Sequence, residues 1–163
     1  GPLPSAAARL AIAKPLENEG VSITDQALEK ILQVTQCYAY FLQQWGSHTW
    51  RAAEASPIDV DAVNVASTTA VAALDESFFR VCFDRLTPKE KKYLRAMAEL
   101  GAGPHRSGDI AACYSAEVTS LAPTRSSLIA KGMVWSPNHG DTAFTVPMFD
   151  EFMKRIIPGN DWR

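Results

Sequence analysis

The chain has 163 residues, 47% hydrophobic and 21% charged, so it can bury a core and is too apolar to be disordered. Its formal net charge of −2 weighs against a protein built only to bind nucleic acid. No apolar run approaches the roughly 18 residues that cross a bilayer, and no secretory leader opens the chain, so we expect a cytoplasmic protein without a membrane partner.

The first residues, 1–5, are expected to be a linker or the remnant of a cleaved tag, because the chain begins Gly-Pro without methionine. A helical unit is expected over residues 6–75. Its first clear helix lies in "GVSITDQALEKILQVTQ", where Thr24 is a good N-cap and Asp25 favours the positive end of the helix dipole. The apolar stripe of this helix is Leu28, Ile31, Leu32 and Val34.

A second helix is predicted in "CYAYFLQQWGSHTWRAAEA". Its aromatic stripe of Tyr38, Phe41 and Trp45 is interpreted as core rather than as a ligand platform. Gly46 weakens this helix by about 1 kcal/mol relative to alanine, unless a neighbouring helix needs to come close at that point. Ser56-Pro57 breaks the chain, and a third helix rich in alanine and valine is expected from near Asp59 to about Ala73.

A second unit is expected over residues 76–163. Its best-signalled helix is "LTPKEKKYLRAMAELG", in which Thr87 is the N-cap, Pro88 takes the first helical position and Glu90 completes a capping box. Gly101 ends this helix. The residues predicted to face inward are Tyr93, Leu94, Met97 and Leu100.

The remaining elements follow in an order that defines the fold. "SGDIAACY" is predicted as a short helix capped by Ser107, and residues 117–132 as a third helix that Pro123 should kink. "MVW" and "TAFTV" are predicted strands around the turn "SPNHGD", and "MFDEFMKRII" is a closing helix. The predicted fold class is therefore mainly α: a helical lid bundle followed by a winged helix-turn-helix domain with a small β-hairpin wing.

Charge singles out one segment. Residues 87–132 hold seven Lys/Arg and four Asp/Glu, the only positive stretch of the chain. In a winged helix this segment carries the recognition helix, whose exposed face meets base edges while lysine and arginine hold phosphates. Only two members of that helix are basic, and the wing has no lysine or arginine. The DNA-binding candidates are Arg106, Thr119, Ser120, Thr124, Arg125, Ser127, Lys131 and His139.

Other sites are weaker. The lysines Lys89, Lys91 and Lys92 are interpreted as a solvated face, with phosphate contact as the alternative. "GPHRSGD" has the glycine spacing of a phosphate-binding loop, but Asp109 stands where the lysine belongs and would repel phosphate. The histidines and cysteines lack metal-ligand spacing, so no metal site is expected and the cysteines are predicted to be buried thiols in a reducing cytosol. No catalytic residue set is assigned.

Two stretches resemble a known family. "GVSITDQALEKILQVTQCYAYFLQQWGSHTW" is similar to the helical lid of bacterial and archaeal AAA-type P-loop ATPases, akin to the archaeal origin-recognition ATPases. That family opens the second lid helix with a Gly-Tyr-Pro-Tyr-like turn followed by Phe-Leu-Gln. Here Cys37 takes the glycine position, Ala39 the proline position, and Phe41, Leu42 and Gln43 follow. The winged helix resembles the domain that ends such proteins, most specifically at residues 123–125 and 140–147.

The resemblance implies that the nucleotide motifs and the parallel sheet lie upstream, with ATP and Mg as cofactors of the parent protein and none in this fragment. The family often places a lid arginine near the ATP γ-phosphate, and Arg51, the only arginine of the two clear lid helices, fits that position poorly. The predicted function is a non-catalytic C-terminal fragment whose winged helix docks on DNA, mostly through the backbone, under control of the ATPase core. The alternative is a protein-interaction module, and the lid disfavours a free-standing transcription regulator.

Overall fold

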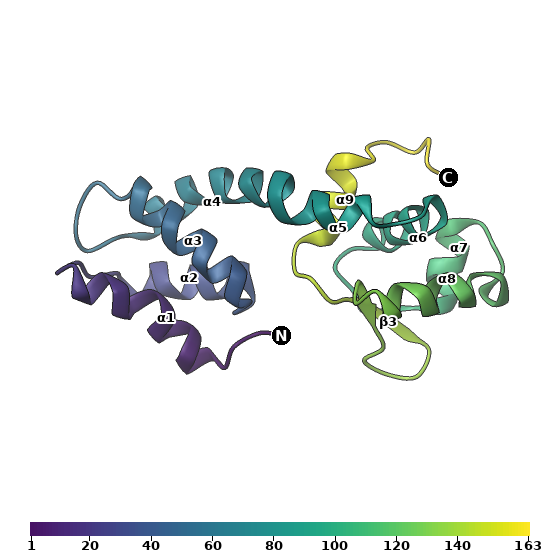
Figure 1. The fold of residues 1–163 in the computed structure, drawn as a ribbon, viewed down its shortest axis with the longest axis horizontal. Helices are drawn as coiled ribbons and strands as arrows, with labels where there is room; N and C mark the ends of the chain where they lie inside the picture. Colours follow the sequence, from purple (N-terminus) through teal and green to yellow (C-terminus); the bar gives the residue numbers. More distant parts are fainter. The chain divides into compact units, whose positions relative to one another are not determined.

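The computed structural model describes residues 1–163 and divides into two compact units, Gly1–Glu76 and Ser77–Arg163. Figure 1 shows the chain as a ribbon, with the first unit in purple and blue and the second in teal, green and yellow. None of the helices is long and apolar enough to cross a membrane.

The first unit is a helical bundle. Its core side chains include Ile31, Phe41 and Trp45, each fully buried, and the indole N–H of Trp45 donates to Ser67 Oγ at 2.9 Å. The predicted N-cap at Thr24 is confirmed, because its side chain accepts from Ala27 N at 3.2 Å. The helices are α1 Ser5–Asn18, α2 Asp25–Thr35, α3 Ala39–Ala52 and α4 Val60–Leu74.

Helix α1 was not among the predicted elements. It has no side-chain N-cap and contains Pro15, so it lacks the local signals that mark α2. Three residues spaced by four, Ala8, Ile12 and Leu16, bury its inner face. A Cβ added to Gly46 of α3 would stand 3.3 Å from Ile12 Cδ1, so this glycine lets α1 approach α3. That close approach is the condition under which a mid-helix glycine is retained.

A short π-helical turn, η1 Asp75–Phe79, follows α4 and continues into α5 Arg80–Asp84. Phe79 is fully buried in the second unit. Its ring packs against Phe149 and Phe152, with centroids 5.7 and 5.3 Å away. This aromatic cluster anchors the start of the second unit to its closing helix.

The second unit has the winged helix order. The strands form an antiparallel sheet in the order β1-β3-β2, with His105 opposite Thr142 and Val134 opposite Phe144. A mainly α chain, with a helical bundle followed by a winged helix-turn-helix and a small hairpin, is the predicted fold class and is confirmed. The elements are α6 Pro88–Glu99, β1 His105–Arg106, α7 Ser107–Tyr114, α8 Val118–Ala130, β2 Val134–Trp135, β3 Asp141–Phe144 and α9 Phe149–Ile156.

Several local predictions for this unit are confirmed and some are wrong. The capping box of Thr87 and Glu90 is present, with Pro88 at the start of α6. Ser107 does not cap α7, because both its N–H and its hydroxyl donate to the Gly140 carbonyl, at 2.9 and 3.0 Å. Leu100 was predicted to face inward but is 39% exposed, because α6 ends at Glu99. Strand β1 was not predicted.

The cysteines Cys37, Cys82 and Cys113 are unpaired and half-buried, less enclosed than the buried thiols predicted from the sequence. Burial raises the pKa of the Cys82 and Cys113 thiols above their usual range. No group of three or more His, Cys, Asp or Glu side chains is placed to hold a metal ion.

Candidate nucleic-acid interface

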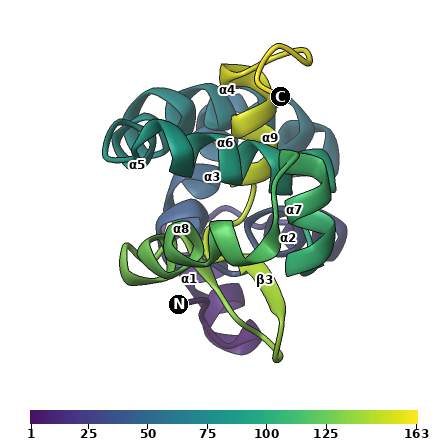
Figure 2. The same cartoon turned by 90° about the vertical axis from the view of Figure 1, so that its right-hand side faces the viewer.

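The site predicted from the sequence is built on α8 and the hairpin of β2 and β3. Helix α8 begins after Glu117, which provides no side-chain cap, and runs without interruption past Pro123 to Ala130. In Figure 2 the hairpin that contains β3 projects beyond α8. The candidate residues are therefore distributed over the helix, the hairpin and the start of α7.

Arg125 points into the domain. Its Nε donates to Thr142 Oγ1 at 2.7 Å, and one of its Nη atoms donates to Ser136 Oγ and to the Asp141 carbonyl, both at 2.9 Å. Thr142 itself is fully buried in β3. Arg125 thus ties the middle of α8 to the hairpin, and three of its five guanidinium N–H donors are used within the domain.

Lys131 and Ser127 converge on one buried carboxylate. Lys131 Nζ donates to Glu90 Oε2 at 2.7 Å and to the Arg85 carbonyl at 3.1 Å, and Ser127 Oγ donates to Glu90 Oε1 at 2.7 Å. Glu90 Oε2 also accepts from Thr87 N at 2.7 Å as part of the capping box. Glu90 therefore serves α6 and α8 at once and links the start of one helix to the end of the other.

These contacts determine the ionisation of Glu90, which is only 3% exposed. Burial by itself would raise the pKa of Glu90, but hydrogen bonds from Lys131, Ser127 and Thr87 favour the carboxylate more strongly. The pKa of Glu90 is consequently lowered from 4.5 to about 2. The carboxylate is a charged part of the domain's framework at neutral pH.

Four of the candidates lie on or near the exposed side of the site. Thr119 and Ser120 are exposed in the first turn of α8, and the Ser120 hydroxyl donates to the Glu117 carbonyl at 2.7 Å. His139 is exposed in the turn of the hairpin, and Thr124 is half-buried in α8. All four are polar and, with histidine neutral, uncharged, so they provide hydrogen bonds rather than charge to a partner.

Arg106 is the most exposed cation among the candidates, with 76% of its side chain accessible. It lies in β1 immediately before α7, and its Nε is 3.4 Å from Asp141 Oδ1. The Asp141 side chain is 18% exposed, but an ion pair whose arginine is this exposed is weak, about 0–1 kcal/mol, so the guanidinium can exchange onto another anion. Arg106 is therefore available to bind a phosphate.

Two of the three lysines at the start of α6 contact aromatic rings, and the third is exposed to solvent. Lys91 Nζ lies 4.2 Å from the ring centroid of Phe83, and Lys92 Nζ lies 4.4 Å from that of Tyr114. Lys89 is exposed. The cation–π contacts hold two of the three lysines along the surface while leaving part of their charge accessible to solvent.

The structure brings Ser127 and Lys131 together on one partner and places Arg125 on a different set, and the sequence did not predict either set as part of the site. Those partners are Thr142, Ser136 and the carbonyl of Asp141 for Arg125, and Glu90 for the other two. Glu90 was recognised as a capping residue, and its capping geometry was the one available signal. Its second role depends on α8, 37 to 41 positions away in the sequence.

The family described as "Domain of unknown function (DUF8462)" matches residues 76–153, slightly less than half of the chain. A search of curated proteins gave no match.

Among solved structures, two variants of Thermotoga maritima RuvB are each 18% identical, with TM-score 0.40, over 86% of this chain and 46% or 45% of theirs. The Thermotoga maritima RuvB Holliday junction branch migration motor is 17% identical with TM-score 0.39, over 96% of this chain and 49% of that one. The chain thus spans about half the length of these structures. Similarities this distant carry no functional argument, so the function proposed below rests on the chain's own residues.

Proposed function

We propose that this chain is the non-catalytic C-terminal region of an AAA-type ATPase, and that its winged helix unit docks on DNA through the phosphate backbone. The observation that carries the DNA proposal is the separation of charge between the units. The second unit, 77–163, holds 12 Lys/Arg and 9 Asp/Glu, whereas the first, 1–76, holds 4 and 9. A positive domain with an exposed arginine at the start of a helix suits phosphate contact.

The ATPase assignment is supported by the turn before α3. The resembling family carries glycine where this chain has Cys37, and Cys37 has a φ of 58°, the left-handed conformation that favours glycine. Tyr38, Ala39 and the Phe-Leu-Gln sequence follow it in the order the family uses. The left-handed conformation of Cys37 is the one that a glycine at this position would favour, and this supports the proposed relationship.

The mode of docking follows from how the basic residues are used. Arg125 and Lys131 are occupied by Thr142 and Glu90, so they support the recognition helix instead of reading bases. Arg106 is the most exposed cation among the candidates, and Thr119, Ser120 and His139 provide hydrogen-bonding groups in addition. This set provides weak, salt-sensitive binding without sequence discrimination.

The test is fluorescence anisotropy of a labelled duplex at several salt concentrations. We expect binding at low salt, and Arg106→Ala should reduce the slope of log K against log salt by about 0.9, the contribution of one phosphate contact. Arg51→Ala removes the same charge from the acidic first unit and should leave the slope unchanged. Absence of binding, or equal effects of the two variants, would contradict docking through Arg106.

The ATPase assignment has its own test. This chain contains no GxxxxGK[ST] sequence, so we expect isothermal titration calorimetry to detect no ATP affinity tighter than the millimolar range. Tighter binding by this chain would overturn the view that nucleotide is held by an upstream core.

A protein-docking role is the second candidate, and one observation favours it. Val118 and Ile129 of α8 and Trp135 of β2 are 44%, 38% and 52% exposed, an apolar set on the elements predicted to meet DNA. The proposed partner is the ATPase core of the same protein. Val118→Lys separates the two roles: it should strengthen binding to duplex DNA if α8 faces phosphates, and weaken association with a separately produced core if α8 packs on protein.

A further inference from the structure

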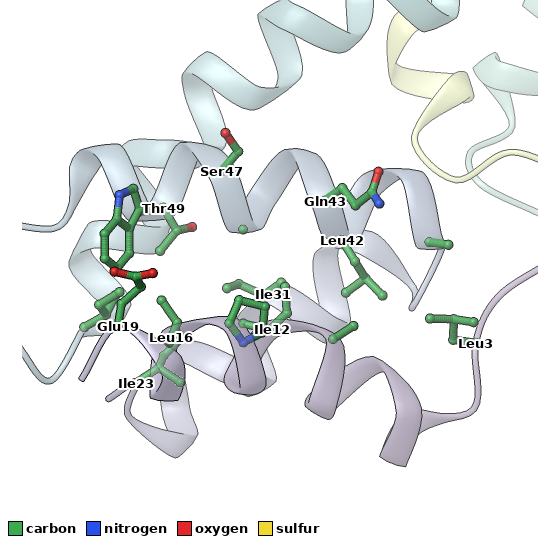
Figure 3. A pocket seen from close by; sticks show the side chains of 16 residues that line it. Leu3, Ile12, Leu16, Glu19, Ile23, Ile31, Leu42, Gln43, Ser47 and Thr49 are labelled. Carbon is green, nitrogen blue, oxygen red and sulfur yellow. The ribbon is translucent and has the colours of Figure 1, made fainter. Parts of the chain in front are cut away.

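The first unit contains a cavity of about 530 Å³ bounded by α1, α2 and α3. This volume falls within the range of small-molecule pockets, roughly 300–1,000 Å³. Figure 3 shows side chains from α1 and α3 on opposite sides of it, with Ile12 and Leu16 facing Leu42 and Thr49. Most of the lining is aliphatic, so the cavity suits the apolar part of a small ligand better than a fully polar molecule.

One polar group in the lining has no partner. Thr49 of α3 is 2% exposed, and its Oγ1 makes no hydrogen bond. Buried hydroxyls are nearly always paired, because leaving one unpaired forfeits the hydrogen bonds it had in water. The other buried threonine of the unit, Thr35, is paired with the Ile31 carbonyl at 2.8 Å. The Oγ1 atom has almost no accessible surface, so the hydroxyl lies beside the cavity without opening into it.

The charge of the cavity selects among ligands. Glu19 is the only charged residue that lines it, and the other polar members are neutral: Gln43, Ser47, Thr49 and Trp50. In the view of Figure 3, Glu19 and Thr49 lie toward the end of the cavity opposite Leu3. A single carboxylate beside an apolar space repels anionic amphiphiles such as fatty acids and attracts a cation.

We propose that this cavity binds a small amphiphilic amine. The apolar body lies against Ile12, Leu16 and Ile31, and the ammonium lies at the end of the cavity that holds Glu19 and Thr49. An ammonium has three donors and no acceptor, so it matches the carboxylate of Glu19, the one charged group of the lining. The site is separate from the winged helix unit and does not depend on DNA docking.

The experiment compares three probes with the same eight-carbon body and different head groups. Binding of n-octylamine, 1-octanol and octanoate to the full chain is measured from amide chemical shifts in two-dimensional NMR, below the concentration at which the probes aggregate. The expected affinity order is octylamine, then octanol, then octanoate. Glu19→Gln should weaken octylamine roughly threefold, as expected for an exposed ion pair, and leave octanol unchanged.

A variant that fills the cavity tests whether the probes bind there. Ala11 lines the cavity from α1, so Ala11→Phe should abolish saturable binding of all the probes. Ala7→Phe adds the same ring to an exposed position of α1 outside the lining and should leave binding intact. If Ala11→Phe fails to fold, Glu19→Gln still decides between the head groups. Equal affinity for octylamine and octanoate, or no saturable shifts at Gly46 and Thr49, would overturn the proposal.

Discussion

The two units differ in the polar groups that they bury. The winged helix unit buries Glu90 and Arg95 at 3% and 4% exposure and gives each several partners. Arg95 pairs with Glu99 at 2.7 Å and donates to the Ile157 carbonyl at 2.8 Å, which ties α6 to the end of α9. The helical bundle buries no charge, and it leaves the Thr49 hydroxyl unpaired beside a cavity.

The net charge of a segment is therefore a poor guide to the charge that its surface presents. The basic segment 87–132 suggested a surface for DNA, yet Lys131, Arg125 and Arg95 are largely used to hold the unit together. A small winged helix has little apolar area to spare, so ionic networks fix its helices and its hairpin. The bundle is stabilised by apolar packing and can keep an open cavity.

The largest expected effect is on the network of Glu90. Glu90→Ala should lower the free energy of unfolding by about 3 kcal/mol, because it leaves the Lys131 ammonium, the Ser127 hydroxyl and the Thr87 N–H without their acceptor. Urea unfolding followed by circular dichroism measures it. Glu117→Ala, at an exposed position of the same unit, serves as the control and should change stability by less than about 0.5 kcal/mol. Similar losses of stability in both variants would contradict the role of Glu90 as the acceptor of this network.

The pH dependence of stability reports the same network without a mutation. The pKa of Glu90 is about 2 in the folded state and near 4.5 when unfolded, so the folded state binds this proton less tightly. Its stabilising contribution, about 3 kcal/mol, is complete above pH 4.5 and is lost as the pH falls toward 2. Urea unfolding at several pH values should show this loss in the wild type and not in Glu90→Gln. A parallel decline in the two proteins would contradict the assignment to Glu90.

Arg125 and Arg106 allow a half-buried structural cation to be tested beside an exposed one. Arg125→Ala should destabilise the protein by about 2 kcal/mol, because it removes a half-buried charged donor of three hydrogen bonds. Arg106→Ala removes the same charge from an exposed side chain and should cost less than about 0.5 kcal/mol. Thermal unfolding of the two variants side by side decides this, and a reversed order would show that Arg125 is available to a ligand.

The smallest expected effect has the opposite sign. Thr49→Val replaces an unpaired buried hydroxyl by a methyl group of similar shape and should stabilise the bundle by about 1 kcal/mol. Thr35→Val is the matched control, and it should destabilise by about 1 kcal/mol because it removes the bond to the Ile31 carbonyl. Urea unfolding of both variants gives the two signs, and destabilisation by Thr49→Val would mean that its hydroxyl is paired in solution.

The fold was predictable wherever the signals were local. The caps at Thr24 and Thr87 and the buried faces of α2, α3 and α6 follow from residues three or four positions apart. Helix α1 was missed because its evidence is tertiary: Ile12 fits the space above Gly46 of α3. Strand β1 was not predicted because its two residues, which follow a cis proline, are too few to show the alternating pattern of a strand.

The sequence predicted which residue types belong to the candidate site, but it did not predict which partners their side chains contact. The sequence identified Arg125, Ser127 and Lys131 as polar members of the recognition helix, but their partners lie 17, 37 and 41 positions away, in β3 and α6. No pattern within α8 distinguishes an arginine that reaches a buried threonine from one that reaches a phosphate. Only the packing of the hairpin on the helix determines which of these two partners the arginine reaches.

The most direct test of this account is the side-chain Nε–H signals of the arginines in an NMR titration with a DNA duplex at low salt. The Nε–H of Arg125 donates to Thr142 inside the domain, whereas that of Arg106 faces solvent and Asp141. Duplex DNA should shift the Arg106 signal and the amide signals of Thr119 and Ser120, and should leave the Arg125 signal in place. A shift at Arg125 without one at Arg106, or no shift at all, would contradict it.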